Sequence, residues 1–204
     1  MNSVKLGANN VQPTKILCVG RNYHDHIKEL NNPVPDNMVV FNKPPSSIDT
    51  QLCSYHGEAI HYEGEICFMV KGGQFCAVGF GLDLTKRQLQ TELKIKGLPW
   101  ERAKAFDGSA VFSRFIPIEG IQIESLQIEL FINCVRVQKG AVGDMIYSPS
   151  SILEELTTYT RLEDGDIIMT GTPQGVGEVH QGDVFLGRLS SQNKILLEVE
   201  WIAQ

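Results

Sequence analysis

The sequence HYEGEICFMV occupies residues 61–70 and contains the clearest fold signal of the chain. From residue 59 to residue 70, an alternation of polar and apolar side chains gives way to a continuously apolar run. This change is typical of a strand that is buried on one face at its start and on both faces further along. Because side chains alternate along a strand, we expect His61, Glu63 and Glu65 to project from the same face.

Two carboxylates on one strand face, those of Glu63 and Glu65, indicate a cation site. They repel each other and lose hydration when they are partly buried, unless a cation neutralises them. An oxygen-only pair suits a hard cation such as Mg²⁺ or Mn²⁺. On spacing alone, a solvated polar face of an edge strand is the commoner origin of this pattern.

Outside this stretch the chain shows many short strands and few helices. We expect strands at residues 15–20, 39–41, 77–84, 126–137 with a turn near Asn133, 166–170, 181–183 and 195–201. Helices are expected at residues 23–30, 85–96 and 148–159. Thr85 and Gln88 match a capping box for the second helix, which Gly97 and Pro99 should end. This order predicts a β-rich α+β fold in a single domain, residues 1–204, without alternating β-α-β units.

The composition excludes several classes of function. The 204 residues carry a formal net charge of −6 and no basic stripe interleaved with aromatic residues, so we expect no nucleic-acid partner. No apolar run approaches the ~20 residues that span a bilayer, and residues 1–10 show no targeting signal, so we expect no membrane partner. The five cysteines are scattered without Cys-x-x-Cys spacing, which argues against zinc and disulfide frameworks and favours a reducing cytoplasm.

Asp83 stands where a strand passes into the second helix. Arg87 and Gln90 lie three residues apart on that helix, so all three side chains can face one cleft. A cap beside the helix dipole is the ordinary role of such an acid, and an arginine–glutamine pair at this spacing is more often on the surface.

Two further segments have the composition of catalytic groups, and a third is considered as a nucleotide-binding loop. On a helix, His26 and Glu29 share a face, and a carboxylate beside an imidazole raises its basicity, although an ordinary surface pair has the same spacing. Lys104, flanked by apolar residues, can stabilise an oxyanion, while a lysine with its charge in water is the commoner case. The glycine-rich turn at residues 171–177 lacks the Gly-Lys-Ser/Thr ending of a P-loop, so we reject a nucleotide site.

Short motifs follow one another along the chain from Lys15 onward. They are VGRNY at 19–23, KPP at 43–45, HYEGE at 61–65, LDLT at 82–85 followed by Arg87 and Gln90, KAF at 104–106, GDIIMTGTP at 165–173 and GVG at 175–177. In this order they resemble the fumarylacetoacetate hydrolase family. Two positions depart from it: Gln88 replaces the usual acid, and Tyr62 replaces a common histidine. We expect neither to affect the metal site, although substrate preference can differ.

By this resemblance the fold is the family's β-roll of curved mixed sheets with a few short helices, usually in a homodimer. The length is similar to that of the small acylpyruvase and oxaloacetate decarboxylase subgroup. The implied metal ligands are Glu63, Glu65 and Asp83. The implied catalytic residues are His26 and Glu29, on a lid at about residues 22–37, and the enolate-stabilising Lys104. The implied substrate contacts are Arg21, Lys43, Arg87, Gln90 and Thr172.

The implied function is that of an enzyme that uses Mg²⁺, or Mn²⁺, and acts on small anionic 2-oxo acids through a metal-chelated enolate. One site can serve acylpyruvate C–C hydrolysis, oxaloacetate decarboxylation or keto–enol tautomerisation, and the sequence does not choose among them. An isomerase, decarboxylase or hydratase of aromatic degradation is the nearer alternative. A non-catalytic metal-dependent binding module is the remoter one, and it would have no use for His26, Glu29 and Lys104.

Overall fold

The fold is built around a curved eight-stranded mixed sheet, in a computed structural model that describes residues 2–30 and 35–204. Neighbouring strands follow the order β4 (Val39–Lys43), β3 (Ile16–Gly20), β13 (Ile167–Met169), β7 (Gly64–Lys71), β8 (Gln74–Asp83), β9 (Ala110–Phe112) and β5 (Ile48–Asp49), with β10 (Ile116–Pro117) paired to β8. The β13–β3 and β5–β9 pairs are parallel, and the other pairs of this sheet are antiparallel.

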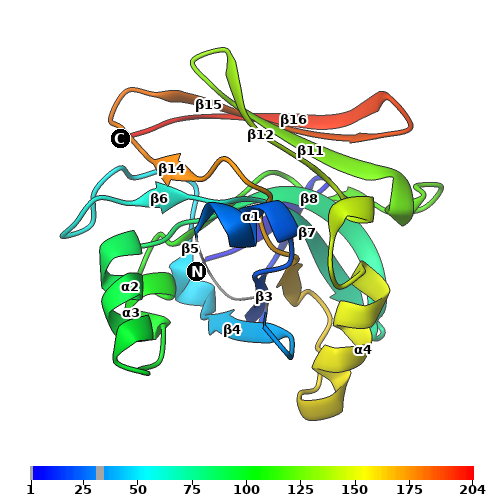
Figure 1. The fold of residues 1–204 in the computed structure, drawn as a ribbon. Coiled ribbons are helices and arrows are strands. Elements are labelled where there is room, and N and C mark those ends of the chain that lie inside the picture. Colours follow the sequence, from blue (N-terminus) through cyan, green and yellow to red (C-terminus); the bar gives the residue numbers. More distant parts are fainter. Residues whose placement is uncertain (1, 31–34) are drawn as a thin grey trace.

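A second, four-stranded antiparallel sheet covers one face of the first. Its order is β12 (Val135–Ala141), β11 (Leu126–Ile132), β15 (Val184–Ser191) and β16 (Lys194–Ile202). Figure 1 shows this sheet across the top and the helices on the opposite side. The helices are α1 (His24–Glu29), α2 (Arg87–Ile95), α3 (Glu101–Lys104) and α4 (Pro149–Tyr159), with 3₁₀ turns η1 (Pro45–Ser47), η2 (Ile123–Ser125) and η3 (Val142–Asp144).

Two small strand pairs complete the architecture. They are β1 (Val4–Leu6) with β2 (Asn9–Val11), and β6 (His61–Tyr62) with β14 (Gly177–Glu178). Curved mixed sheets with few short helices confirm the predicted fold class. In the described ranges no helix is long and apolar enough to cross a membrane.

The continuously apolar run is explained by the position of β7 between β13 and β8. Phe68 packs into the core beneath the second sheet, and Met69, on the opposite strand face, packs into a separate cluster. Both side chains are at most 1% exposed. Burying one such side chain contributes about 1.5–3 kcal/mol, so this strand anchors the two glutamates at its start.

Of two predictions about the helices, one is confirmed and one is wrong. The helix predicted at residues 148–159 is confirmed by α4, and Ser148 caps it, because its hydroxyl accepts a hydrogen bond from the Ser151 amide. The capping box at Thr85 and Gln88 is wrong, since α2 begins at Arg87 and Lys86 stands at its cap without a side-chain hydrogen bond. The Thr85 hydroxyl lies in the interior, where it accepts a hydrogen bond from a buried lysine.

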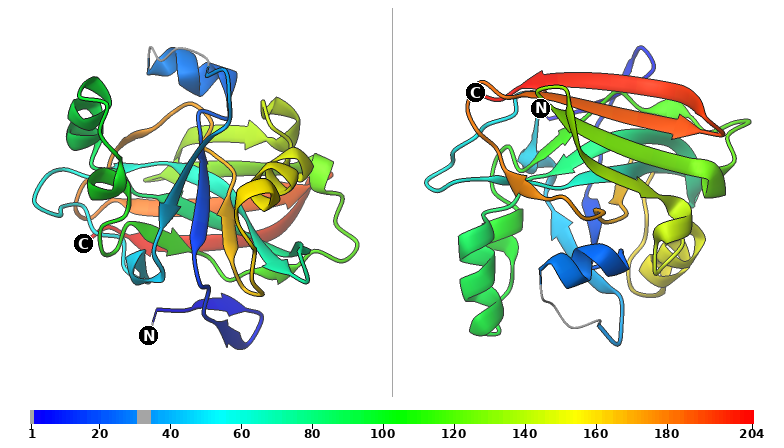
Figure 2. Two further views of the ribbon diagram at one scale, coloured as in Figure 1. Left: turned by 90° about the horizontal axis from the view of Figure 1, so that it is seen from below. Right: turned by 45° about the horizontal axis from the view of Figure 1, so that its top comes forward.

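Helix α1 lies on the side of the molecule opposite the second sheet, between α2 and α4 (Figures 1 and 2). The loop that enters it is fixed to the body: the Asn22 amide donates to the carbonyls of Thr170 and Tyr147 at 2.8 and 3.0 Å. Ile27 is only 2% exposed. Residues 31–34 of the predicted lid lie outside the described residues, and lid motion stays a prediction.

Candidate active site

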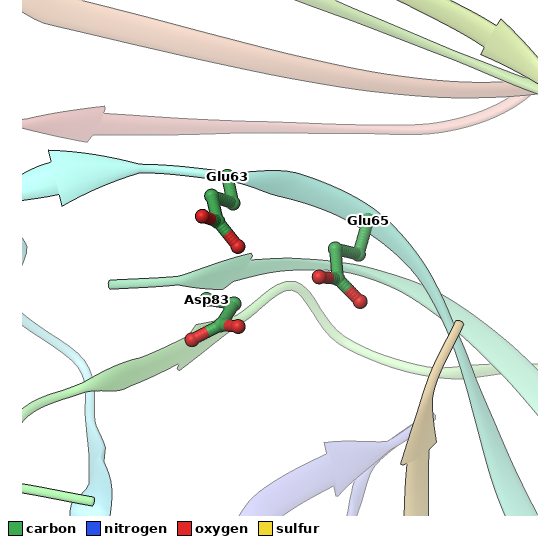
Figure 3. Close-up of side chains that lie close together, drawn as sticks. All are labelled: Glu63, Glu65 and Asp83. Atoms are coloured by element: carbon green, nitrogen blue, oxygen red, sulfur yellow. The ribbon is translucent and has the colours of Figure 1, made fainter. Parts of the chain in front are cut away.

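Three carboxylates meet where the two central strands of the main sheet lie side by side. Glu63 precedes β7, Glu65 lies on it, and Asp83 ends β8. The pairing of Gly64 with Leu82 holds the two strands in this register. Figure 3 shows the side chains gathered in one space, and one oxygen of each lies within 4.8 Å of the others. All three are at most 6% exposed, so a solvated strand face does not describe them.

The three acids differ in their electrostatic surroundings. Burial, together with the charges of Asp83 and Glu63, raises the pKa of Glu65 well above its ordinary value. Burial acts in the same direction on Glu63, but Lys104 and Arg87 hold the pKa of that carboxyl well below its ordinary value. Among the described residues, Glu65 is thus the one acid of the three without an ion-pair partner. A buried, all-oxygen donor set in which one carboxylate has no ion pair fits a hard divalent cation.

Lys104, at the end of α3, is only 2% exposed and packs against this cluster instead of extending into solvent. Its ammonium donates to Glu63 Oε2 at 2.8 Å, Asp83 Oδ2 at 2.7 Å and Thr85 Oγ1 at 2.6 Å. Burial lowers the pKa of this ammonium, but Asp83 and Glu63 more than compensate and raise it above its ordinary value. A permanent cation beside the carboxylates can stabilise negative charge on a bound oxygen.

Lys43 lies behind the cluster. Its side chain is fully buried, and its ammonium is 2.8 Å from Asp83 Oδ1 and donates to the backbone carbonyls of Leu84 and Lys104. It is not among the residues that line the cavity. The structure thus gives Lys43 a contact with Asp83, and its role as a substrate contact stays a prediction.

The pair predicted on α1 forms, and His26 lines the same cavity as the three carboxylates. His26 Nδ1 lies 3.1 Å from Glu29 Oε2, and Glu29 Oε1 accepts a hydrogen bond from the Gly175 amide at 2.9 Å. Burial lowers the pKa of His26, and the carboxylates of Glu63 and Glu29 offset only part of this effect. When Nδ1–H of the neutral imidazole donates to the Glu29 carboxylate, the lone pair on Nε2 remains available to accept a proton.

The glycine-rich turn at residues 171–177 holds two of these carboxylates, a role that the sequence did not reveal. The Gly171 amide donates to Glu65 Oε2 at 2.7 Å, and the Gly175 amide donates to Glu29. Both glycines have φ of +99°, a backbone conformation that a side chain disfavours. A Cβ at Gly175 would also lie 2.0 Å from the Val137 carbonyl oxygen.

Gln138, on β12, connects the second sheet to the site and was also missed. Its carbonyl oxygen accepts from the Gly64 amide at 2.9 Å, between the two ligand glutamates. Its amide nitrogen donates to Thr172 Oγ1 and to the Pro173 carbonyl, both at 2.9 Å. No local pattern identifies such a residue, because its partners lie 34 to 74 positions away in the chain.

One cavity collects all predicted site residues except Glu29 and Lys43. Its lining includes His26, Lys104, Arg21, Arg87, Gln90, Thr172 and the three carboxylates of Glu63, Glu65 and Asp83. Phe41, Lys94 and Trp100 line it as well, and sequence reasoning gave them no role. Position 94 follows 87 and 90 at helical spacing, which was the available signal.

Comparisons with known proteins agree with this geometry. The model of the fumarylacetoacetate (FAA) hydrolase C-terminal family matches residues 15–74 and 77–194. The chain is 37% identical over 185 residues to the mitochondrial oxaloacetate tautomerase FAHD1 of Bos taurus, covering 82% of this chain and 83% of that protein.

Solved structures are similar over the full chain. A candidate fumarylacetoacetate isomerase/hydrolase from Oleispira antarctica has a TM-score of 0.94 at 32% identity, with 100% of both chains covered. Fumarylpyruvate hydrolase from Pseudomonas aeruginosa, in complex with Mn²⁺ and pyruvate, has a TM-score of 0.88 at 26% identity, covering 100% of this chain and 96% of that one. Motif order, fold, site geometry and family match lead to one conclusion. The chain belongs to the fumarylacetoacetate hydrolase family.

Proposed function

We propose that this protein is a metal-dependent enzyme of small 2-oxo acids and that its main reaction is the keto–enol tautomerisation of oxaloacetate. One observation carries the proposal: a neutral, carboxylate-oriented imidazole and a buried ammonium line the same cavity as a three-carboxylate cation site. Enolisation requires a base that removes the proton from carbon and a group that stabilises the negative charge on the carbonyl oxygen. The similarity to an oxaloacetate tautomerase supports this choice of reaction.

In the proposed reaction His26 moves the proton. Its Nε2 takes a proton from C3 of the keto form, while Glu29 stabilises the imidazolium through Nδ1–H. The electron pair of the C3–H bond forms the C2–C3 double bond, and Lys104 stabilises the negative charge on the C2 oxygen. The proton then returns to that oxygen, which gives the enol. A divalent cation held by Glu63, Glu65 and Asp83 supplies Lewis-acid polarisation when it is bound.

Acylpyruvate hydrolysis is the second candidate, because a fumarylpyruvate hydrolase is among the similar structures. It would use the same imidazole to activate water. Oxaloacetate decarboxylation would need chiefly the electron sink. A binding module is the weakest candidate, since it has no use for the His26–Glu29 pair or for the buried Lys104.

The test is a comparison of reactions in one preparation. Purified protein with Mg²⁺, with Mn²⁺ and with EDTA is assayed for enol-to-keto conversion of oxaloacetate, CO₂ release from it, and hydrolysis of acetylpyruvate and fumarylpyruvate. We expect tautomerisation to have the highest kcat/KM and to be lost in EDTA. A higher kcat/KM for either acylpyruvate would favour the hydrolase, and activity that survives EDTA would contradict the metal site.

We further propose a homodimer working in the reducing cytoplasm, with α1 as part of a lid over the cavity. The five cysteines are all free, which supports a reducing compartment. Glu29 on α1 accepts a hydrogen bond from the Gly175 amide of the 171–177 turn, which supports a closed position of α1. Sedimentation equilibrium tests the dimer. Proteolysis near residues 22–37, with and without oxalate, tests the lid: equal cleavage in both conditions would contradict it.

A further inference from the structure

The outer wall of the cavity carries a lysine that the proposed reaction does not use. Three residues of helix α2 line the cavity: Arg87, Gln90 and Lys94. Because they are spaced by three and four residues, they lie on the same face of the helix. Arg87 is engaged, because its guanidinium donates to Gln90 and to Glu63. Lys94 lies one helical turn beyond Gln90 and is half-buried.

Lys94 differs from the two buried lysines of the site, Lys43 and Lys104, in having no carboxylate partner among the described residues. Lys104 and Lys43 both pair with Asp83, whereas no carboxylate in the described part of the chain lies within ion-pair distance of the Lys94 ammonium. Burial and the neighbouring charges of Arg21 and Arg87 lower the pKa of Lys94 to about 8. A cation that is desolvated beside other cations is stabilised by any anion that enters.

An aromatic wall leads from the carboxylate cluster to Lys94. The Lys104 ammonium lies 5.2 Å from the centroid of the Phe41 ring, and the Phe41 and Trp100 centroids are 5.9 Å apart. The Lys94 ammonium lies 5.1 Å from the centroid of the Trp100 ring. These contacts place Lys104, Phe41, Trp100 and Lys94 as successive neighbours in the lining of one cavity.

The charge of the cavity favours a ligand with two negative charges. Its cationic side chains are those of Arg21, Arg87, Lys94 and Lys104, against three carboxylates, and a divalent cation would add two positive charges. A monocarboxylate bound at the metal cluster would leave the Lys94 end of the cavity positive. A second carboxylate on the ligand would neutralise it.

We propose that Lys94, held against Trp100, binds the distal carboxylate of a 2-oxo dicarboxylic acid and is the residue that selects such acids over 2-oxo monocarboxylic ones. This inference rests on the proposed function and assigns the residue that recognises the second carboxylate of its substrate. The 1-carboxylate and 2-oxo group lie at the carboxylate cluster and Lys104, and the chain of the substrate runs along Phe41 and Trp100.

The test compares oxaloacetate with its 4-methyl ester, which differs only in the distal charge. Variants are Lys94→Met, which removes the charge at similar length, Lys94→Arg, which keeps it, and Lys96→Met, which removes an exposed charge just beyond α2. Hydrogen bonds between charged groups contribute enough for Lys94→Met to raise KM for oxaloacetate by about 10–100-fold. We expect the effect on the ester to be at least ten times smaller, and Lys94→Arg and Lys96→Met to stay within about threefold of wild type for both compounds.

Titration calorimetry with both compounds in the presence of Mg²⁺ reports affinity even where there is no turnover. The proposal is supported if Lys94→Met loses affinity for oxaloacetate but not for its methyl ester, and if Lys94→Arg and Lys96→Met lose affinity for neither compound. Equal losses for both compounds would mean that Lys94 only supports Trp100 and would overturn it, as would no loss for either. If wild type binds oxaloacetate through Lys94 but does not tautomerise it, the proposed reaction fails and the binding role of Lys94 stands.

Discussion

At the level of single residues, the burial of His26 should set the acidic limit of activity. A base must be unprotonated, and burial lowers the pKa of this imidazole from its ordinary value of 6.5. The acidic limb of the kcat/KM profile should therefore lie below pH 6.5. In Glu29→Gln the hydrogen bond that raises this pKa is weakened, so the limb should move to still lower pH while the maximal rate falls. A limb at or above pH 6.5, or one that does not move in the variant, would contradict the assignment of His26 as the base.

Removing the imidazole should separate the reactions that one site can serve. His26→Ala should suppress tautomerisation and acylpyruvate hydrolysis by the ~10²–10⁴-fold that a general base contributes. Oxaloacetate decarboxylation should fall less, because loss of CO₂ needs chiefly an electron sink. Glu63→Ala should abolish all three, since Glu63 belongs to the cation site and pairs with Lys104. The measurement is kcat/KM for each reaction in both variants, and a His26→Ala enzyme near wild type in tautomerisation would refute the assignment.

At the level of elements, the glycine-rich turn matters because it holds Glu29 from outside α1. Gly175→Ala places a Cβ 2.0 Å from the Val137 carbonyl, so the turn must shift and its amide must leave Glu29. We expect kcat/KM to fall at least tenfold, with a loss of about 1–3 kcal/mol in the free energy of unfolding. Gly182→Ala is the matched control: φ is +85° there, but nothing lies within 4 Å of the added Cβ. It should lose stability without losing activity, as measured by urea unfolding and kinetics, and equal activity losses in both variants would show that strain alone is responsible.

At the level of the whole molecule, the sequence predicted what depends on local pattern. The apolar run of β7 and the helix α4 both follow from the local pattern of apolar and polar residues. Contacts set by the order of strands could not be predicted: Gln138 meets Gly64 only because the second sheet covers the first. The capping box failed for the same reason, since a lysine distant in sequence binds the Thr85 hydroxyl in the folded chain. Motif order supplied the candidate site, but the roles of the 171–177 turn and of Lys94 required the structure.

The buried carboxylates also link cation binding to the stability of the whole fold. A ligand that binds only the folded state at 100 times its Kd adds about 2.7 kcal/mol, which corresponds to roughly 5–10 °C in Tm for a chain of this size. Glu65→Gln keeps an oxygen that can accept the Gly171 hydrogen bond and removes the charge that the other two acids repel. In EDTA we therefore expect the Tm of this variant to be no lower than that of wild type. In excess Mg²⁺ or Mn²⁺, only wild type should show the increase of roughly 5–10 °C in Tm. Scanning calorimetry in both buffers provides the measurement. An equal gain in the variant would place the cation elsewhere, and a variant that melts lower in EDTA would show that the Glu65 charge stabilises the cation-free fold.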